Sequence, residues 1–170
     1  MRSIKPIMLQ QKDAPNFLQV KLELGNNKFL TIIGVRIKDD THPPQFQALS
    51  EHLETIKNTS IVIGGGDFNE WKNYVKKKIP PDYSVETPVF RWGKKGDFTT
   101  LSTWSVVLES KAVIDHIITC DVHRTILEDY NWDFVNPKNG YAGRQDKDYK
   151  SDLLCLPDHA ILCGEIYFDF

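Results

Sequence analysis

Residues 60–69 read SIVIGGGDFN, a short apolar run that is followed by three glycines and then by Asp67, Phe68 and Asn69. A β-rich run this short, ended by glycines, predicts a buried strand. Polar side chains directly after such a strand lie at its carboxyl end, where α/β proteins gather ligand-binding residues. We therefore predict that Asp67 and Asn69 belong to a functional site. The plainer alternative is that both side chains only satisfy backbone groups of a turn.

The residues before this stretch predict the rest of a crossover unit. Residues 17–24 and 28–37 are rich in β-forming side chains, and Gly25-Asn26-Asn27 between them predicts a β-hairpin. An amphipathic helix is predicted after Pro43 and Pro44, because apolar side chains recur there at helical spacing. The apolar positions are Phe46, Leu49, Leu53 and Ile56. The order strand, helix, strand predicts an α/β fold.

Two more motifs follow downstream. Ile114-Asp115-His116-Ile117 lies in an apolar run, residues 112–119, that predicts one strand, and Pro157-Asp158-His159 precedes a β-rich run over residues 160–168. A charge buried in a strand is costly unless it is paired, so Asp115 is expected to have a partner. The partner is either a cation in a structural ion pair or a histidine, and we favour the histidine. By strand alternation His116 points to the opposite face, where we expect a structural role.

The composition narrows the class of protein. A chain of 170 residues with 41% hydrophobic content predicts a single domain over residues 1–170. The net charge of −2 lacks the basic excess that is typical of tight nucleic-acid binding. The three cysteines, Cys120, Cys155 and Cys163, have no CxxC spacing, which argues against a zinc cluster or a disulfide framework. With no apolar run long enough for a membrane span or a signal peptide, we expect a cytoplasmic protein.

The three motifs, taken in this order, resemble the endonuclease/exonuclease/phosphatase superfamily. The family's usual forms are Gly-Asp-Phe-Asn, an Asp within an apolar strand, and Ser-Asp-His, of which only the Ser is changed here, to Pro157. Its members include pancreatic deoxyribonuclease, abasic-site endonucleases, neutral sphingomyelinases and inositol phosphatases. The resemblance implies the carboxy-terminal part of a deoxyribonuclease I-like, four-layer αββα sandwich. It also implies metal-dependent hydrolysis of phosphodiesters or phosphomonoesters.

The resemblance assigns a role to each motif residue. Asp67 would orient or deprotonate the attacking water, and Asn69 would hydrogen-bond the substrate phosphate. His159 would face the scissile phosphate as a general acid/base or as a cationic stabiliser, with Asp115 hydrogen-bonded behind it. Asp158 would bind the metal ion, directly or through water. These residues supply the positioning and charge stabilisation that phosphate-ester hydrolysis needs.

Two features depart from the family pattern. Arg36 stands where the family usually has a His or Tyr, and an Arg there would clamp the phosphate without shuttling protons, unless it is merely an exposed strand-end residue. The family's opening segment carries a Glu that binds Mg²⁺, but residues 1–16 contain no Glu, and Glu23 is predicted to face solvent. We therefore expect a chain that lacks this segment, binds Mg²⁺ or Mn²⁺ weakly and has very little activity on its own.

The sequence does not distinguish between several types of substrate. The substrate is a phosphate ester of unassigned type: DNA, RNA, a lipid head group or a sugar phosphate. The alternative to an enzyme is a catalytically silent remnant that acts as a dimeric or binding module. Loss of an opening segment would expose an apolar inter-sheet face, so a homodimer is predicted.

Overall fold

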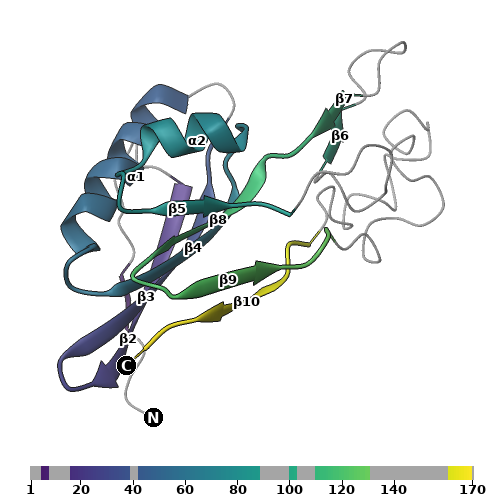
Figure 1. The fold of residues 1–170 in the computed structure, drawn as a ribbon. Helices are drawn as coiled ribbons and strands as arrows, with labels where there is room; N and C mark the ends of the chain where they lie inside the picture. The colour runs from purple at the N-terminus through teal and green to yellow at the C-terminus, as the bar shows by residue number, and fades with distance from the viewer. Residues whose placement is uncertain are drawn as a thin grey trace, which may run out of the picture.

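The structure, a computed structural model, describes residues 5–7, 16–38, 42–88, 100–102, 110–130 and 161–169. These residues form an α/β arrangement, as the sequence predicts (Figure 1). The two helices are α1 (His42–Ile56) and α2 (Lys72–Lys78). The strands are β1 (Lys5–Ile7), β2 (Asn16–Gly25), β3 (Lys28–Arg36), β4 (Ile61–Asp67), β5 (Ser84–Glu86), β6 (Thr100–Ser102), β7 (Ser110–Ala112), β8 (Asp115–Cys120), β9 (Arg124–Leu127) and β10 (Gly164–Tyr167).

Six of the strands form one sheet in the order β1-β2-β3-β4-β8-β5. Strands β3 and β4 are parallel, and the other neighbours are antiparallel. The predicted hairpin is confirmed as β2 and β3, joined by a turn in which Gly25, Asn26 and Asn27 all have positive φ. Glycine and asparagine tolerate this left-handed backbone better than other residues do, which explains the turn composition.

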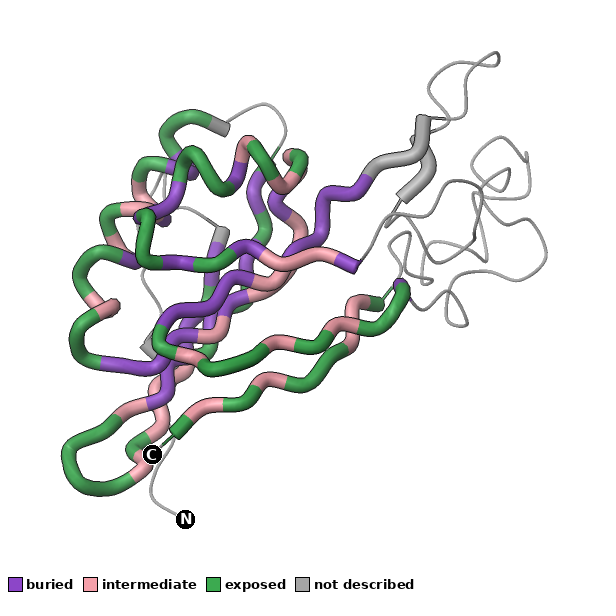
Figure 2. Tube along the Cα trace, in the orientation of Figure 1, coloured by how far each residue is buried: buried purple, intermediate pink, exposed green. Residues whose placement is uncertain are grey.

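Helix α1 connects the two parallel strands, so the predicted crossover unit is also confirmed. Its apolar side chains Phe46, Leu49 and Leu53 are buried against the sheet, together with Ile33 and Val35 of β3. Burial of one such Leu or Ile side chain contributes about 1.5–3 kcal/mol relative to exposure. Figure 2 shows the buried residues concentrated between the sheet and the two helices. Within the described residues, no helix has the length and apolar character needed to cross a membrane.

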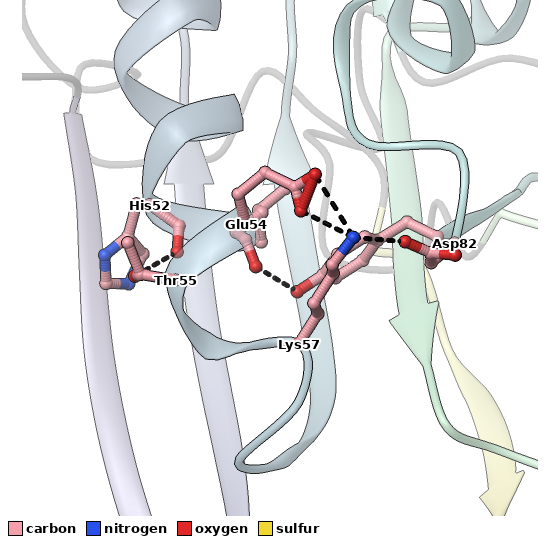
Figure 3. A network of polar contacts seen from close by, with 7 residues as sticks. His52, Glu54, Thr55, Lys57 and Asp82 are labelled. Carbon is pink, nitrogen blue, oxygen red and sulfur yellow. Dashed lines mark hydrogen bonds and ion pairs between the residues drawn. The ribbon is translucent and has the colours of Figure 1, made fainter.

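Lys57, just after α1, forms ion pairs with Glu54 of the helix and with Asp82 in the segment before β5 (Figure 3). Its Nζ atom lies 2.7 Å from Glu54 Oε2 and 2.5 Å from Asp82 Oδ2. The hydrogen bonds to Asp82 and then to Glu54 raise the pKa of Lys57, so the ammonium keeps its charge at physiological pH. Beside it, the Tyr83 hydroxyl donates to the Leu53 carbonyl at 2.9 Å. These contacts fix α1 at the sheet end opposite Asp67.

Strands β9 and β10 form a separate two-stranded sheet. Figure 1 places α1 and α2 on one side of the six-stranded sheet and this pair on the other. The arrangement of helices, sheet and second sheet is that of layers in an αββα sandwich. On the same face Leu18 is 66% exposed and Ile32 is 42% exposed. Apolar side chains at those positions are typical of a face that another layer or molecule covers.

Two predicted strand boundaries differ from the structure. The strand predicted over residues 60–63 extends to Asp67, because its glycines pair with β3 on one side and β8 on the other. At Gly66, with φ 142°, an added Cβ would lie 2.0 Å from the Val35 carbonyl oxygen, so only glycine fits. The strand predicted over residues 112–119 is instead interrupted at Val113 and Ile114, because the Ile114 carbonyl accepts a hydrogen bond from Phe68 N at 2.8 Å.

Candidate active site

Three charged residues form a row across neighbouring strands, at the end of the sheet where β3 and β4 finish and β8 begins. Arg36 ends β3, Asp67 ends β4 and Asp115 begins β8. Arg36 pairs in register with Asp67, and Asp67 pairs with Asp115. Paired residues point to the same face, and adjacent strands are about 4.8 Å apart. The fold therefore brings together three predicted site residues that span 79 positions of the chain, from 36 to 115.

The row points away from the helices. Val35 and Ile37 are buried in the core under α1, so Arg36 between them faces the other side of the sheet, where it is exposed. Exposure falls along the row, since Asp67 is half-buried and Asp115 is only 9% exposed. A cation at the open end and a carboxylate at the buried end suit a site that binds an anion and activates a neighbouring group.

Asn69 holds the Asp67 carboxylate in place. The Asn69 backbone N–H donates to Asp67 Oδ1 at 2.9 Å, and its side-chain Nδ2 donates to Asp67 Oδ2 at 3.2 Å. The same Nδ2 also donates to the Ile37 carbonyl at 2.6 Å, so both of its hydrogens point inward. Asn69 has φ 50°, a left-handed conformation that Asn tolerates. A contact from Nδ2 to a phosphate, as the sequence analysis expects, would require one of these two bonds to break.

Tyr130 fixes the backbone of Asp115. Its hydroxyl donates to the Asp115 carbonyl at 2.7 Å, and the residue is only 3% exposed. Burial, and then the charge of Asp115, raise the pKa of Tyr130, so the hydroxyl remains a donor throughout the physiological range. Tyr130 is not predictable from the sequence, because no local pattern indicates a hydrogen bond between a lone Tyr and a residue 15 positions earlier.

His116 occupies the opposite face from Asp115, as predicted. It is fully buried, its Nε2 atom lies 2.7 Å from the Glu70 carbonyl oxygen, and its ring lies 5.7 Å from that of Phe68. Burial lowers the pKa of the imidazole, and Lys72 lowers it further, while the Glu70 bond and Asp115 act in the raising direction. His116 is therefore a neutral residue behind the row rather than part of it.

The remaining predicted site residues, Asp158 and His159, lie outside the described residues. The predicted pair of Asp115 with His159 and the role of Asp158 at a metal ion therefore stay predictions. Among the residues that the structure does describe, no three His, Cys, Asp or Glu side chains lie close enough together to hold a metal ion. Asp67 and Asp115 offer carboxylate oxygens of the kind that Mg²⁺ prefers, but these two alone do not make a magnesium site.

A solved structure gives the comparison that decides the fold. The crystal structure of truncated Caenorhabditis elegans TDP2 matches 98% of this chain and 66% of that chain, with a TM-score of 0.57 and 15% sequence identity. This chain shares the fold of that TDP2 structure. At this identity the likeness concerns the fold alone. The predicted deoxyribonuclease I-like α/β fold is confirmed by this match.

Two further TDP2 structures match less of the chain. One is D. rerio TDP2 complexed with single strand DNA product, with a TM-score of 0.46, 16% identity and coverage of 75% of this chain and 56% of that chain. The other is humanized D. rerio TDP2 with 14 mutations, with a TM-score of 0.41, 17% identity and coverage of 66% and 51%. This chain thus spans less than two thirds of each solved chain. No protein family and no curated protein matches the sequence.

Proposed function

We propose that this chain is a nuclease-like hydrolase of phosphate esters whose site is the row Arg36, Asp67 and Asp115 together with Asn69 and His159. The observation that carries the proposal is the register of the sheet, which puts a cation and two carboxylates side by side at one edge. A phosphate ester needs such a combination, because its hydrolysis requires a bound anion, an oriented water molecule and charge stabilisation. Nucleic acid is one candidate substrate among the phosphate esters.

The first step falls to Arg36 and Asp67. The exposed Arg36 guanidinium binds a non-bridging phosphoryl oxygen, for which its planar donor geometry is well suited. Asp67 accepts a proton from the attacking water or orients it, and Asn69 keeps the carboxylate aimed by donating to both of its oxygens. The strand register of Arg36 and Asp67 and the hydrogen bonds in the turn support this assignment.

The second step falls to His159 with Asp115. In this proposal one ring N–H of His159 would donate to the Asp115 carboxylate, and the other nitrogen would act on the scissile phosphate as a general acid/base or as a cationic stabiliser. The burial of Asp115 and the Tyr130 bond to its backbone supply the rigid support that such a pair requires. The superfamily resemblance implies a divalent metal, Mg²⁺ or Mn²⁺, with Asp158 as a ligand. Because the described carboxylates do not complete a metal site, the roles above are those of the side chains alone. A bound metal ion would add charge stabilisation on the phosphoryl oxygens.

The test is a single-turnover assay with the purified chain in excess over bis(p-nitrophenyl) phosphate, a generic phosphodiester. We expect slow release of p-nitrophenol that needs Mg²⁺ or Mn²⁺ and stops with a chelator. The corresponding phosphomonoester and a single-stranded oligonucleotide, assayed in parallel, identify the substrate type. Release equal to that of buffer for all three substrates and both metals would overturn the proposal and favour the alternative of a catalytically silent binding module.

A further inference from the structure

His116 joins the strand that begins with Asp115 to the loop that carries Asp67 and Asn69. It lies opposite Gly66 in the ladder between β4 and β8, with its side chain fully buried on the helix side of the sheet. Its Nε2 atom lies 2.7 Å from the carbonyl oxygen of Glu70, a residue 46 positions earlier in the chain. Such a contact belongs to the tertiary fold and not to a local turn.

The contact with Glu70 determines which ring nitrogen of His116 carries hydrogen. A carbonyl oxygen can only accept, so Nε2 is the protonated nitrogen. Nδ1 is buried and has no hydrogen-bond partner among the described residues. A second proton on Nδ1 would leave a buried charge without an acceptor, beside the ring of Phe68 at 5.7 Å. The neutral ring with its hydrogen on Nε2 is therefore the stable form.

Two bonds tie the loop after β4 to the strand segment around Asp115. Phe68 N donates to the Ile114 carbonyl at 2.8 Å, and His116 donates to the Glu70 carbonyl. Phe68 and Glu70, which make these two hydrogen bonds, alternate along the chain with Asp67 and Asn69 of the candidate site. A shift of the Glu70 backbone would therefore displace Asn69 directly, and through it the two bonds that aim the Asp67 carboxylate.

We propose that His116 is a positioning residue, whose Nε2–H bond to Glu70 holds residues 67–70 in the arrangement that presents Asp67 and Asn69 to a substrate. Its catalytic consequence rests on the proposed function. Its structural consequence, the order of residues 67–70, can be measured without any substrate. A failure of the proposed function can therefore be distinguished from a failure of the structural role of His116.

Two variants separate hydrogen bonding from packing. His116→Leu keeps a side chain of similar bulk in the core but removes the donor. His116→Gln places an amide N–H close to the position of Nε2. The matched control is His52→Leu, because His52 is a half-buried histidine on α1 that stacks on Phe17, away from the loop. A histidine that only filled space would leave the loop unchanged in all three variants.

The first readout is amide hydrogen exchange by NMR at neutral pH. In His116→Leu we expect exchange in residues 67–71 to rise by about tenfold or more, with recovery in His116→Gln and no change in His52→Leu. Residues 30–35 of β3 serve as an internal reference and should keep their protection. In the unmodified chain the ring nitrogen shifts of His116 should report hydrogen on Nε2. Full protection in His116→Leu, or hydrogen on Nδ1, would overturn the proposal.

The second readout is steady-state kinetics. We expect His116→Leu to lower kcat by about 100-fold with KM within about twofold, because misplacing catalytic groups weakens the transition state more than substrate binding. His116→Gln should recover most of the loss. An inactive unmodified chain contradicts the proposed function and leaves hydrogen exchange to decide the role of His116. Full kcat in a His116→Leu variant would contradict that role alone. If His116→Leu does not fold, the nitrogen shifts and the exchange of His116→Gln decide the matter.

Discussion

Asp67 and Asp115 lie directly opposite each other on the antiparallel strands β4 and β8. Like charges in this position destabilise a strand pair, so the sheet retains an unfavourable arrangement at one edge. Arg36 lies opposite Asp67 on the other side, in β3. An arrangement of this kind is typical of functional sites, where residues needed for activity can lower the stability of the fold.

Replacing Arg36 should separate charge compensation from phosphate recognition. Arg36→Gln removes the cation beside the Asp67 carboxylate, and we expect a loss of about 0.2–1 kcal/mol in the free energy of unfolding. Arg36→Lys should keep that stability but still raise KM for a phosphodiester by about tenfold, because an ammonium lacks the planar two-donor geometry. Urea unfolding and steady-state kinetics measure the two effects. Lys38→Gln, at an exposed neighbouring position, is the control, and an equal effect from it would contradict a specific role for Arg36.

Asn69 should be sensitive to both backbone and side-chain changes. Asn69→Gly tolerates φ 50° but loses the side-chain bonds to Asp67 and Ile37, whereas Asn69→Ala also strains the backbone. We expect Asn69→Ala to be less stable than Asn69→Gly by about 1–2 kcal/mol, and both to be less active. The control is Asn27, with φ 60° in the distant hairpin turn. Its Ala and Gly variants should show a similar stability difference without any change in turnover; loss of turnover there would count against a local effect at Asn69.

Stability should fall in acid because of two histidines, the buried His116 and the half-buried His52. Burial lowers the pKa of His116 and His52 in the folded chain from the ordinary value of 6.5. As pH falls below 6.5, the unfolded chain binds protons that the folded chain excludes, so the free energy of unfolding decreases until the lowered pKa is passed. Each histidine contributes a slope of at most about 1.4 kcal/mol per pH unit in that window.

Urea unfolding between pH 7.5 and 5, roughly the window above carboxylate titration, measures this slope. The Glu70 carbonyl, Lys72 and Asp115 also influence the pKa of His116, but the pH dependence predicted here comes from protonation of the His116 ring. His116→Gln should therefore flatten the dependence, and His52→Gln should flatten the remainder. An unchanged slope in both variants would contradict the assignment.

The exposed apolar face should cause self-association. Leu18 and Ile32 lie on the face opposite the helices, and they are 66% and 42% exposed. We predict a dimer at micromolar concentration in sedimentation experiments, because such surfaces are seldom left in water. Leu18→Lys should shift the chain toward monomer, while Glu23→Lys, an exposed change on the same strand, should not. A compact monomer for the unmodified chain would contradict this prediction.

The sequence predicts the elements with strong periodicity. Two β-rich runs joined by a Gly-Asn-Asn turn predict the hairpin of β2 and β3. The spacing of Phe46, Leu49 and Leu53 predicts α1, because one face of the helix is buried in the core. The position of Asp67 at a strand end also follows from the pattern. These features depend on local chemistry and on which face is apolar.

Other features depend on contacts that no local pattern reports. The strand break before Asp115 arises because Phe68, distant in sequence, takes the Ile114 carbonyl. The bonds of His116 to Glu70 and of Tyr130 to Asp115 each require the tertiary fold to place one atom within hydrogen-bond reach of another. The exact row of Arg36, Asp67 and Asp115 likewise rests on strand register, which a one-residue shift would destroy.

The proposed site is tested by the single-turnover rate of bis(p-nitrophenyl) phosphate hydrolysis in Mg²⁺ for the unmodified chain, Asp67→Asn, His159→Ala and the control Glu23→Gln. We expect a slow metal-dependent rate that Glu23→Gln retains and that both site variants reduce by about 100-fold or more, since each removes a transition-state interaction. Equal rates for all four proteins, or a rate that survives in Asp67→Asn, would contradict it.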